Sequence, residues 1–152
     1  MMKKHKINHE DWIVVCDGRK AIILRNAGDE KYPNLKTLEV HEHDDPPTHA
    51  LGTERPGRVH SAAATGRTAR SAVEQTDWHD EAERAFLKDL AKRLDAAVMS
   101  GKTNALYIVA PPRALGVLRQ AYSPAVRGKL RGEIDHDYVK LPISEIERRL
   151  FA

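Results

Sequence analysis

The chain has a single cysteine, Cys16, among its 152 residues, which excludes an internal disulfide. Because Cys16 lies in an apolar run, we expect a small buried side chain rather than a reactive thiol. No apolar stretch approaches the ~20 residues that a transmembrane helix needs. The basic residues 1–6 are not followed by the apolar segment of a signal peptide, so we expect a cytoplasmic protein.

Aromatic residues are also scarce, at 5%, and this limits the stacking on bases by which many proteins hold single-stranded nucleic acid. Lys and Arg outnumber Asp and Glu by 25 to 22, a formal net charge of +3. This excess alone is too small to identify a nucleic-acid-binding protein. Hydrophobic residues make up 41%, which is enough for one core, and the length predicts a single domain over 1–152.

The first 43 residues predict three antiparallel strands. The apolar runs 12–16 and 21–25 flank an Asp17-Gly18 turn, a pattern typical of a β-hairpin. Alternating polarity over 35–43 predicts a third strand, half exposed and near an edge of the sheet. Strict alternation places the odd-numbered side chains of this strand on one face and the even-numbered ones on the other.

Two polar segments lack the periodicity of regular structure. We expect residues 1–10 to form a flexible tail. Residues 44–76, rich in Pro, Gly, Thr, Ala and Arg, predict a long loop, and loops of that length tend to be functional or disordered. Apolar side chains at every fourth position then predict a helix over 80–100 that ends at Gly101.

The centre of the fold is predicted at 104–122. The continuous apolar run Leu106–Ala110 is typical of a strand that is buried on both faces. Pro111 ends this strand, and Pro112 opens a helix, because a proline at the first helical position loses no hydrogen bond. The turn between strand and helix therefore lies at the strand's carboxyl end, where open α/β sheets bind ligands.

The C-terminal part predicts a short turn at 125–129, a last strand over 130–139 and a terminal helix opened by Pro142. In that strand, Leu130, Ile134 and Tyr138 are expected on one face. The buried stripe of the terminal helix is expected to consist of Ile143, Ile146 and Leu150. Three antiparallel strands followed by a parallel strand–helix unit predict an α/β domain, with a mixed sheet of about five strands and flanking helices.

Three segments of the chain carry a family resemblance. They are WIVVCDGRKA at 12–21, VAPPRALG at 109–116, and GEIDHD at 132–137, which leads to Leu141-Pro142. The chain resembles the bacterial host attachment protein family, named for a proposed part in the attachment of plant-associated bacteria to host cells. The resemblance spans almost the whole chain, and its motifs are turns and strands rather than catalytic groups.

That family is in turn similar to the central domain of archaeal and eukaryotic class-1 release factors, an RNase H-like α/β fold. In those proteins a Gly-Gly-Gln loop precedes a long helix and reaches the peptidyl-transferase centre. The comparable place here is 65–70, where only Gly66 fits and Arg67 stands at the glutamine's position. The resemblance implies a release-factor-central-domain-like fold and association with RNA or the ribosome, without peptidyl-tRNA hydrolysis.

Two groups of basic residues are the candidate anion-binding site. One lies on the predicted loop and the other within 111–132, which contains no Asp or Glu. Guanidinium groups bind phosphates through paired hydrogen bonds, so these groups suit RNA or the ribosome. The alternative is a solvated surface in which arginines pair with acids such as Asp80 and Glu83. The candidates are Arg55, Arg58, Arg67, Arg70, Arg113, Arg119, Arg127 and Lys129.

A second and weaker set of candidate residues, two histidines and two aspartates, suggests a metal site. His41 and His43 are expected on one face of a strand, and Asp135 and Asp137 on one face of another, where carboxylates and imidazoles can hold an ion. The histidine spacing fits no recognised zinc pattern, and no acids on other strands complete the set. We therefore expect no cofactor.

The favoured function is a non-enzymatic binding protein. A metal-dependent nuclease or hydrolase using those carboxylates and histidines is the first alternative, although no Gly-x-Ser-x-Gly nucleophile elbow supports a serine hydrolase. A factor that acts at the cell surface in attachment is the second alternative, and it requires an export route.

Overall fold

The computed structural model describes residues 6–43 and 66–151, and within the helix that begins at Gly66 it describes side chains from His79 onwards. One mixed sheet has the strand order β3-β2-β1-β4-β5. Its strands are β1 (Trp12–Cys16), β2 (Lys20–Asn26), β3 (Leu35–Glu42), β4 (Leu106–Ala110) and β5 (Leu130–Asp135). The pairs β1–β2 and β2–β3 are antiparallel, whereas β1–β4 and β4–β5 are parallel. The predicted mixed five-stranded α/β sheet is confirmed.

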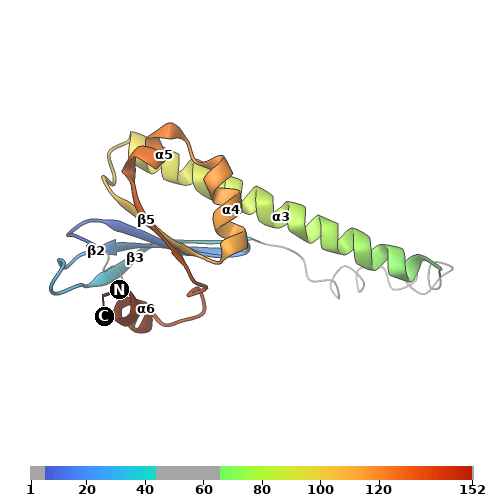
Figure 1. The fold of residues 1–152 in the computed structure, drawn as a ribbon, viewed down its shortest axis with the longest axis horizontal. Coiled ribbons are helices and arrows are strands. Elements are labelled where there is room, and N and C mark those ends of the chain that lie inside the picture. The colour runs from blue at the N-terminus through green and yellow to red at the C-terminus, as the bar shows by residue number, and fades with distance from the viewer. Residues whose placement is uncertain (1–5, 44–65, 152) are drawn as a thin grey trace.

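Helices cover both faces of this sheet. They are α3 (Gly66–Met99), α4 (Pro112–Ala121), α5 (Pro124–Lys129) and α6 (Ile143–Phe151). The first three lie on one face and α6 lies on the other, and α3 continues beyond the ends of the strands (Figure 1). No helix in the described part of the chain is both long and apolar enough to cross a membrane.

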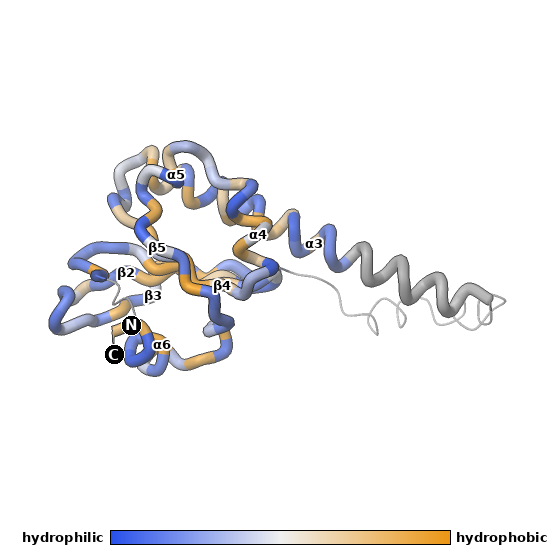
Figure 2. Tube along the Cα trace, viewed as in Figure 1, coloured by the Kyte–Doolittle hydropathy of each residue, from blue (hydrophilic) through white to orange (hydrophobic). Residues whose placement is uncertain are grey.

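Each face of the sheet has its own hydrophobic core, because successive strand residues point to opposite sides. Val14 packs with the α3–α4 layer, and its neighbours Ile13 and Val15 pack with the α6 layer. Figure 2 shows the hydrophobic residues concentrated on the strands and on the helix sides that face them. Cys16 is fully buried in the first core, and burial raises the pKa of its thiol to about 12, as expected for a packing residue.

The central strand–turn–helix unit is confirmed. All five residues of Leu106–Ala110 are buried, and Pro112 is the first residue of α4. Gly101 follows α3 with a left-handed φ of 76°, the conformation that favours glycine at a helix C-terminus. The edge position predicted for β3 is also correct.

The helix α3 begins fourteen residues earlier than the sequence predicted, so part of the expected 44–76 loop is helical. Residues 66–76 hold alanine, arginine, glutamate and glutamine, which favour helices, and contain no proline. They lack an apolar stripe, however, and hydrophobic periodicity cannot detect a helix with no core-facing side. The rest of the predicted loop, 44–65, lies outside the described residues, as does 1–5 of the predicted tail. Residues 6–10 of that tail pack on the fold: Ile7 is fully buried in the α6-side core, and the Glu10 amide donates to the Asn26 carbonyl at 2.8 Å.

A bulge in β3 overturns the strict alternation predicted for that strand. Thr37 pairs with Leu24 and Glu39 pairs with Ile23, which leaves Leu38 without a partner. An extra residue shifts every following side chain to the opposite face. Leu35 therefore belongs to the α6-side core, whereas Glu39 faces α3.

A second irregularity lies in β5, between the pairs Leu106–Leu130 and Tyr107–Gly132. As a result Leu130 packs against the α3-side core and Ile134 against the α6-side core, so the prediction that they share a face is wrong. The strand also ends at Asp135 rather than at 139, because the His136 amide turns back to the Ile134 carbonyl.

The segment predicted as a turn at 125–129 is the short helix α5. Ser123 caps it: the side-chain oxygen accepts a hydrogen bond from the Val126 amide at 3.1 Å. Pro124 occupies its first turn, where proline is favoured. The terminal helix α6 matches the prediction, with Ile146 and Leu150 buried.

Candidate anion-binding groove

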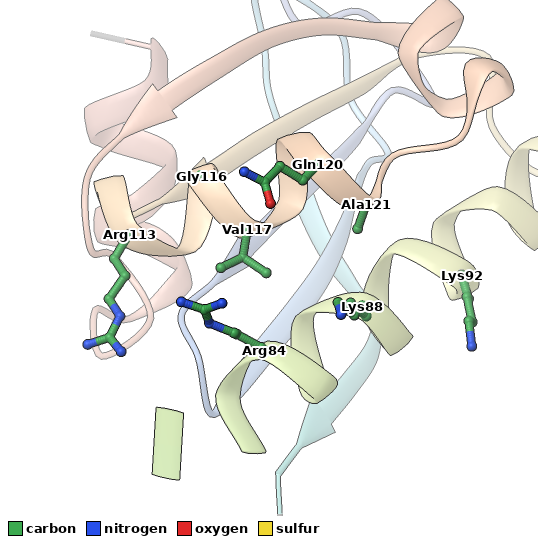
Figure 3. A pocket seen from close by; sticks show the side chains of 8 residues that line it. All are labelled: Arg84, Lys88, Lys92, Arg113, Gly116, Val117, Gln120 and Ala121. Carbon is green, nitrogen blue, oxygen red and sulfur yellow. The ribbon is translucent and has the colours of Figure 1, made fainter. Parts of the chain in front are cut away.

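A groove of about 670 Å³ lies between α3 and α4 on the face of the sheet opposite α6. One wall comes from α3 and the other from α4, and Figure 3 shows the Arg84 side chain reaching from α3 towards Val117 of α4. The lining residues are Arg84, Lys88, Lys92, Arg113, Gly116, Val117, Gln120 and Ala121. Four of these carry positive charge and none is acidic.

The α3 wall is a row of cations at every fourth position. Arg84, Lys88 and Lys92 are exposed, and each step of four residues advances about 6 Å along a helix. The core residues Leu87 and Leu94 lie on the adjoining side of the same helix, and this apolar stripe fixes the rotation of α3 on the sheet. Arg84 points towards α4, whereas Lys92 points away from it (Figure 3).

Within the described residues, Arg84, Lys88 and Lys92 have no acidic partner within ion-pair distance. The charges of these three side chains are therefore not used in ion pairs among the described residues.

Arg113, at one end of the groove, is the exception among its cations. Its guanidinium donates a hydrogen bond to the Asp80 carboxylate of α3, and this contact raises the pKa of Arg113. The pair links the N-terminal turn of α4 to α3. Because a guanidinium has five N–H donors, Arg113 keeps donors for a ligand while it holds Asp80.

The α4 wall is mostly small and apolar. Val117 and Ala121 are half-buried, and nothing lies within 4 Å of the position that a Cβ would take on Gly116. Gln120 is exposed and adds one amide. The groove thus offers a charged side and a nonpolar side to whatever occupies it.

A smaller cavity of about 310 Å³ adjoins the groove where β1 and β4 end. It is lined by charges of both signs, including Asp17, Glu83 and Arg84. The Asp17 carboxylate accepts hydrogen bonds from the Arg19 and Lys20 amides, both at 2.8 Å, so it serves the turn. The cavity lies at the carboxyl ends of these parallel strands, the end of the sheet where open α/β folds tend to place their sites.

One of the eight predicted anion-binding residues, Arg113, lines the groove. Arg119 instead donates to Glu133 at 2.9 Å, and Arg127 donates to the carbonyls of Tyr122 and Arg119 near the end of α4. Lys129 is exposed on α5 and does not line the groove. Arg55 and Arg58 lie outside the described residues, and the side chains of Arg67 and Arg70 are likewise outside the description, although their backbone is part of α3.

Sequence reasoning missed Arg84, Lys88 and Lys92, although the sequence carried a signal for them. All three recur at a spacing of four within a segment that was predicted to be helical, so they share one helix face. What the sequence did not indicate is that α4 lies beside this face and closes a groove over it.

The predicted metal candidates do not converge. His41 contacts Glu39 at 2.8 Å, and Glu39 also accepts hydrogen bonds from Arg93, which hold the pKa of the Glu39 carboxyl at about 2. His43 lies against the Phe86 ring, with 6.1 Å between centroids.

The two acidic candidates lie apart from those histidines, on and after the opposite edge strand. Asp135 is the last residue of β5 and Asp137 follows the strand; both are exposed. Across 6–43 and 79–151, no three His, Cys, Asp or Glu side chains are grouped so that they could hold an ion.

The sequence of residues 12–150 matches the family described as "Protein required for attachment to host cells". The chain belongs to this family. The match includes every strand and α3, α4 and α5, so the groove lies inside the region that defines the family. A search of curated proteins found no match to the chain.

Proposed function

We propose that the protein is a non-enzymatic binding protein whose groove between α3 and α4 holds the phosphates of RNA. One observation carries the proposal: Arg84, Lys88 and Lys92 form a row of unpaired cations on α3, facing a groove lined by no carboxylate. Lysine and arginine side chains supply most of the affinity in nucleic-acid complexes by displacing counterions from phosphates.

The row suits a chain of phosphates better than one small anion. A small anion is held by donors that converge on a point, whereas these three cations are spread over about 12 Å, two steps of four residues. They are also exposed, which matches an extended ligand lying across the surface. The arginines Arg67 and Arg70, further along α3, are proposed as additional contacts.

We choose RNA among polyanions because the host attachment family resembles the central domain of class-1 release factors. An RNase H-like relationship, a cytoplasmic location and contact with the ribosome are parts of the same proposal. Arg55 and Arg58, which lie outside the described residues, are proposed as contacts of the same ligand. The enzymatic alternative has no assembled set of carboxylates and histidines among the described residues to support it.

Filter binding of the purified protein to a structured RNA, at two salt concentrations, tests this function. With three or four phosphate contacts, the logarithm of the affinity should fall against the logarithm of the salt concentration with a slope of about −2 to −3. Binding that is absent, or that salt leaves unchanged, overturns the proposal.

A pair of charge-matched variants locates the site. Replacing Lys88→Gln and Lys92→Gln together should weaken RNA binding about tenfold and reduce the salt slope by one to two. The control is Lys102→Gln with Lys140→Gln, which removes the same charge from exposed residues outside the groove. We expect the control to bind within about twofold of the parent protein; equal losses in both variants would exclude the groove.

The family description supports a second candidate, a factor that acts at the bacterial surface. The two candidates differ in where the protein is found. RNA binding predicts that cell fractionation recovers the chain with the cytosol, and treatment with ribonuclease should release it from large particles. Recovery on intact cells that a protease can strip would favour the surface role.

A further inference from the structure

The geometry points to one unpaired strand of nucleic acid, rather than a duplex, as the occupant of the groove between α3 and α4. Its phosphates would lie along Arg84, Lys88 and Lys92, and its bases would face α4. This inference rests on the proposed function and specifies the form of nucleic acid that the site accepts.

The first argument is the spacing of the row. Residues four apart on one helix are about 6 Å apart along the axis and about 40° apart around it. Successive phosphates of an extended strand are separated by a similar distance, so Arg84, Lys88 and Lys92 are spaced to contact consecutive phosphates of one strand.

The second argument is the width of the site. The groove between α3 and α4 has a volume of about 670 Å³. The major groove of a duplex is by itself about 12 Å wide, so a whole duplex is too broad to enter a groove of this volume. A single backbone is narrow enough to lie along α3 with α4 at its side.

The third argument is the chemistry of the opposite wall. Val117 and Ala121 present apolar surface, and Gln120 presents one amide. Bases that are splayed from a single strand need a nonpolar surface to cover them, whereas the outside of a duplex exposes phosphate on both sides of each groove. No aromatic residue lines the groove, so the strand would be held through its phosphates rather than by base stacking, and little preference among bases is expected.

Arg113, at one end of the row, adds direction to the site. Arg113 is held by Asp80 close to Arg84, since both arginines line the groove and the adjoining cavity. A guanidinium fixed in this way can donate two parallel hydrogen bonds to one phosphate. We assign it to the phosphate that follows the one contacted by Arg84.

Fluorescence anisotropy with matched probes tests the inference. The probes are a labelled 12-nucleotide RNA of unstructured sequence and the blunt duplex of that RNA with its complement, measured with the full chain at low salt. We expect the single strand to bind at least tenfold more tightly. Lys88→Gln with Lys92→Gln should weaken single-strand binding about tenfold, while Lys102→Gln with Lys140→Gln should change it less than twofold.

The outcomes separate this inference from the proposed function. If the duplex binds as tightly as the single strand, and the groove variant weakens both, the single-strand inference is overturned and the RNA-binding function stands. If neither probe binds, both are overturned. If single-strand binding is strong but equally sensitive to the control variant, the strand lies elsewhere on the surface and the inference fails.

Discussion

The basic residues of α3 and those of segment 111–132 occupy opposite environments. Lys88 and Lys92 on α3 are exposed and have no acidic partner among the described residues. In segment 111–132, Arg119 is bonded to Glu133, and Arg127 is bonded to main-chain carbonyls of α4. The first set is available to a ligand, and much of the second is already used by the fold.

The difference teaches that an acid-free stretch of sequence is a poor measure of free positive charge. The partner of Arg119 lies on β5 just past the end of the segment, and the partner of Arg113 lies 33 residues earlier, at Asp80. Charge neutralisation is set by proximity in space, which a linear window does not see. Helical spacing is a better guide, because it states which side chains share a face.

The same contrast exists within α3 between neighbouring residues. Lys92 lines the groove, whereas Arg93, about 100° further round the helix, turns to β3 and donates to both oxygens of Glu39. The bulge in β3 is what brings Glu39 to this face. Arg93 therefore joins the helix to the edge strand, and Lys92 does not.

The largest expected effect on stability comes from breaking the Arg93 pair. Glu39→Gln should destabilise the fold by about 1–2 kcal/mol at pH 7, because the two side chains are only a quarter exposed and the bond is charge-assisted. The RNA affinity of this variant should stay within twofold of that of the parent protein. Urea denaturation followed by circular dichroism measures the free energy of unfolding, and filter binding measures the RNA affinity.

The pH dependence of the stability lost in Glu39→Gln tests whether the ion pair with Arg93 is the cause. The fold lowers the pKa of Glu39 from its ordinary 4.5 to about 2, so the carboxylate stabilises the protein above pH 4.5. This contribution is lost as the pH falls from 4.5 towards 2, and there the variant and the parent should converge. Glu42→Gln, which removes a looser 3.7 Å pair with Lys20, is the control. A difference of the same size at pH 7 and pH 2 contradicts the ion-pair explanation.

A smaller effect, of opposite sign, is expected at the Arg113–Asp80 pair, at one end of the groove. Asp80→Asn removes the acid that faces Arg113 and should tighten RNA binding about threefold at low salt, since one more cation is left unneutralised. Asp137→Asn gives the same change in net charge at an exposed position outside the groove. The double variant Asp80→Asn with Arg113→Gln should lose the gain; a gain shared by Asp137→Asn would assign it to net charge alone.

Local patterns in the sequence predicted much of the fold. The apolar run 106–110, the proline at the start of α4 and the stripe of α6 each depend on a few neighbouring residues, and all three are confirmed. The bulges in β3 and β5 were not predictable, because each is a property of two paired strands rather than of one. The early start of α3 was hidden because 66–76 has no apolar face.

The groove itself was beyond prediction for a related reason. Its walls come from two helices whose lining residues, such as Lys88 and Val117, are separated by many positions along the chain. The sequence contained both the row on α3 and the small residues of α4. Only the parallel β1–β4–β5 arrangement, which lays both helices on one face of the sheet, brings them together.

The smallest predicted effect tests whether pairing within the fold makes an arginine of segment 111–132 less available to a ligand than a lysine of α3. Arg119→Gln should cost less than about 0.5 kcal/mol, because Arg119 is more than half exposed and such pairs are screened by solvent. Glu133 would still accept the 3.3 Å hydrogen bond from the Tyr122 hydroxyl. RNA affinity should stay within twofold, whereas Lys88→Gln, with the same change in charge, should weaken it about threefold. Parallel anisotropy titrations of the two variants measure this, and an equal loss in both would mean that pairing in the fold does not withdraw an arginine from binding.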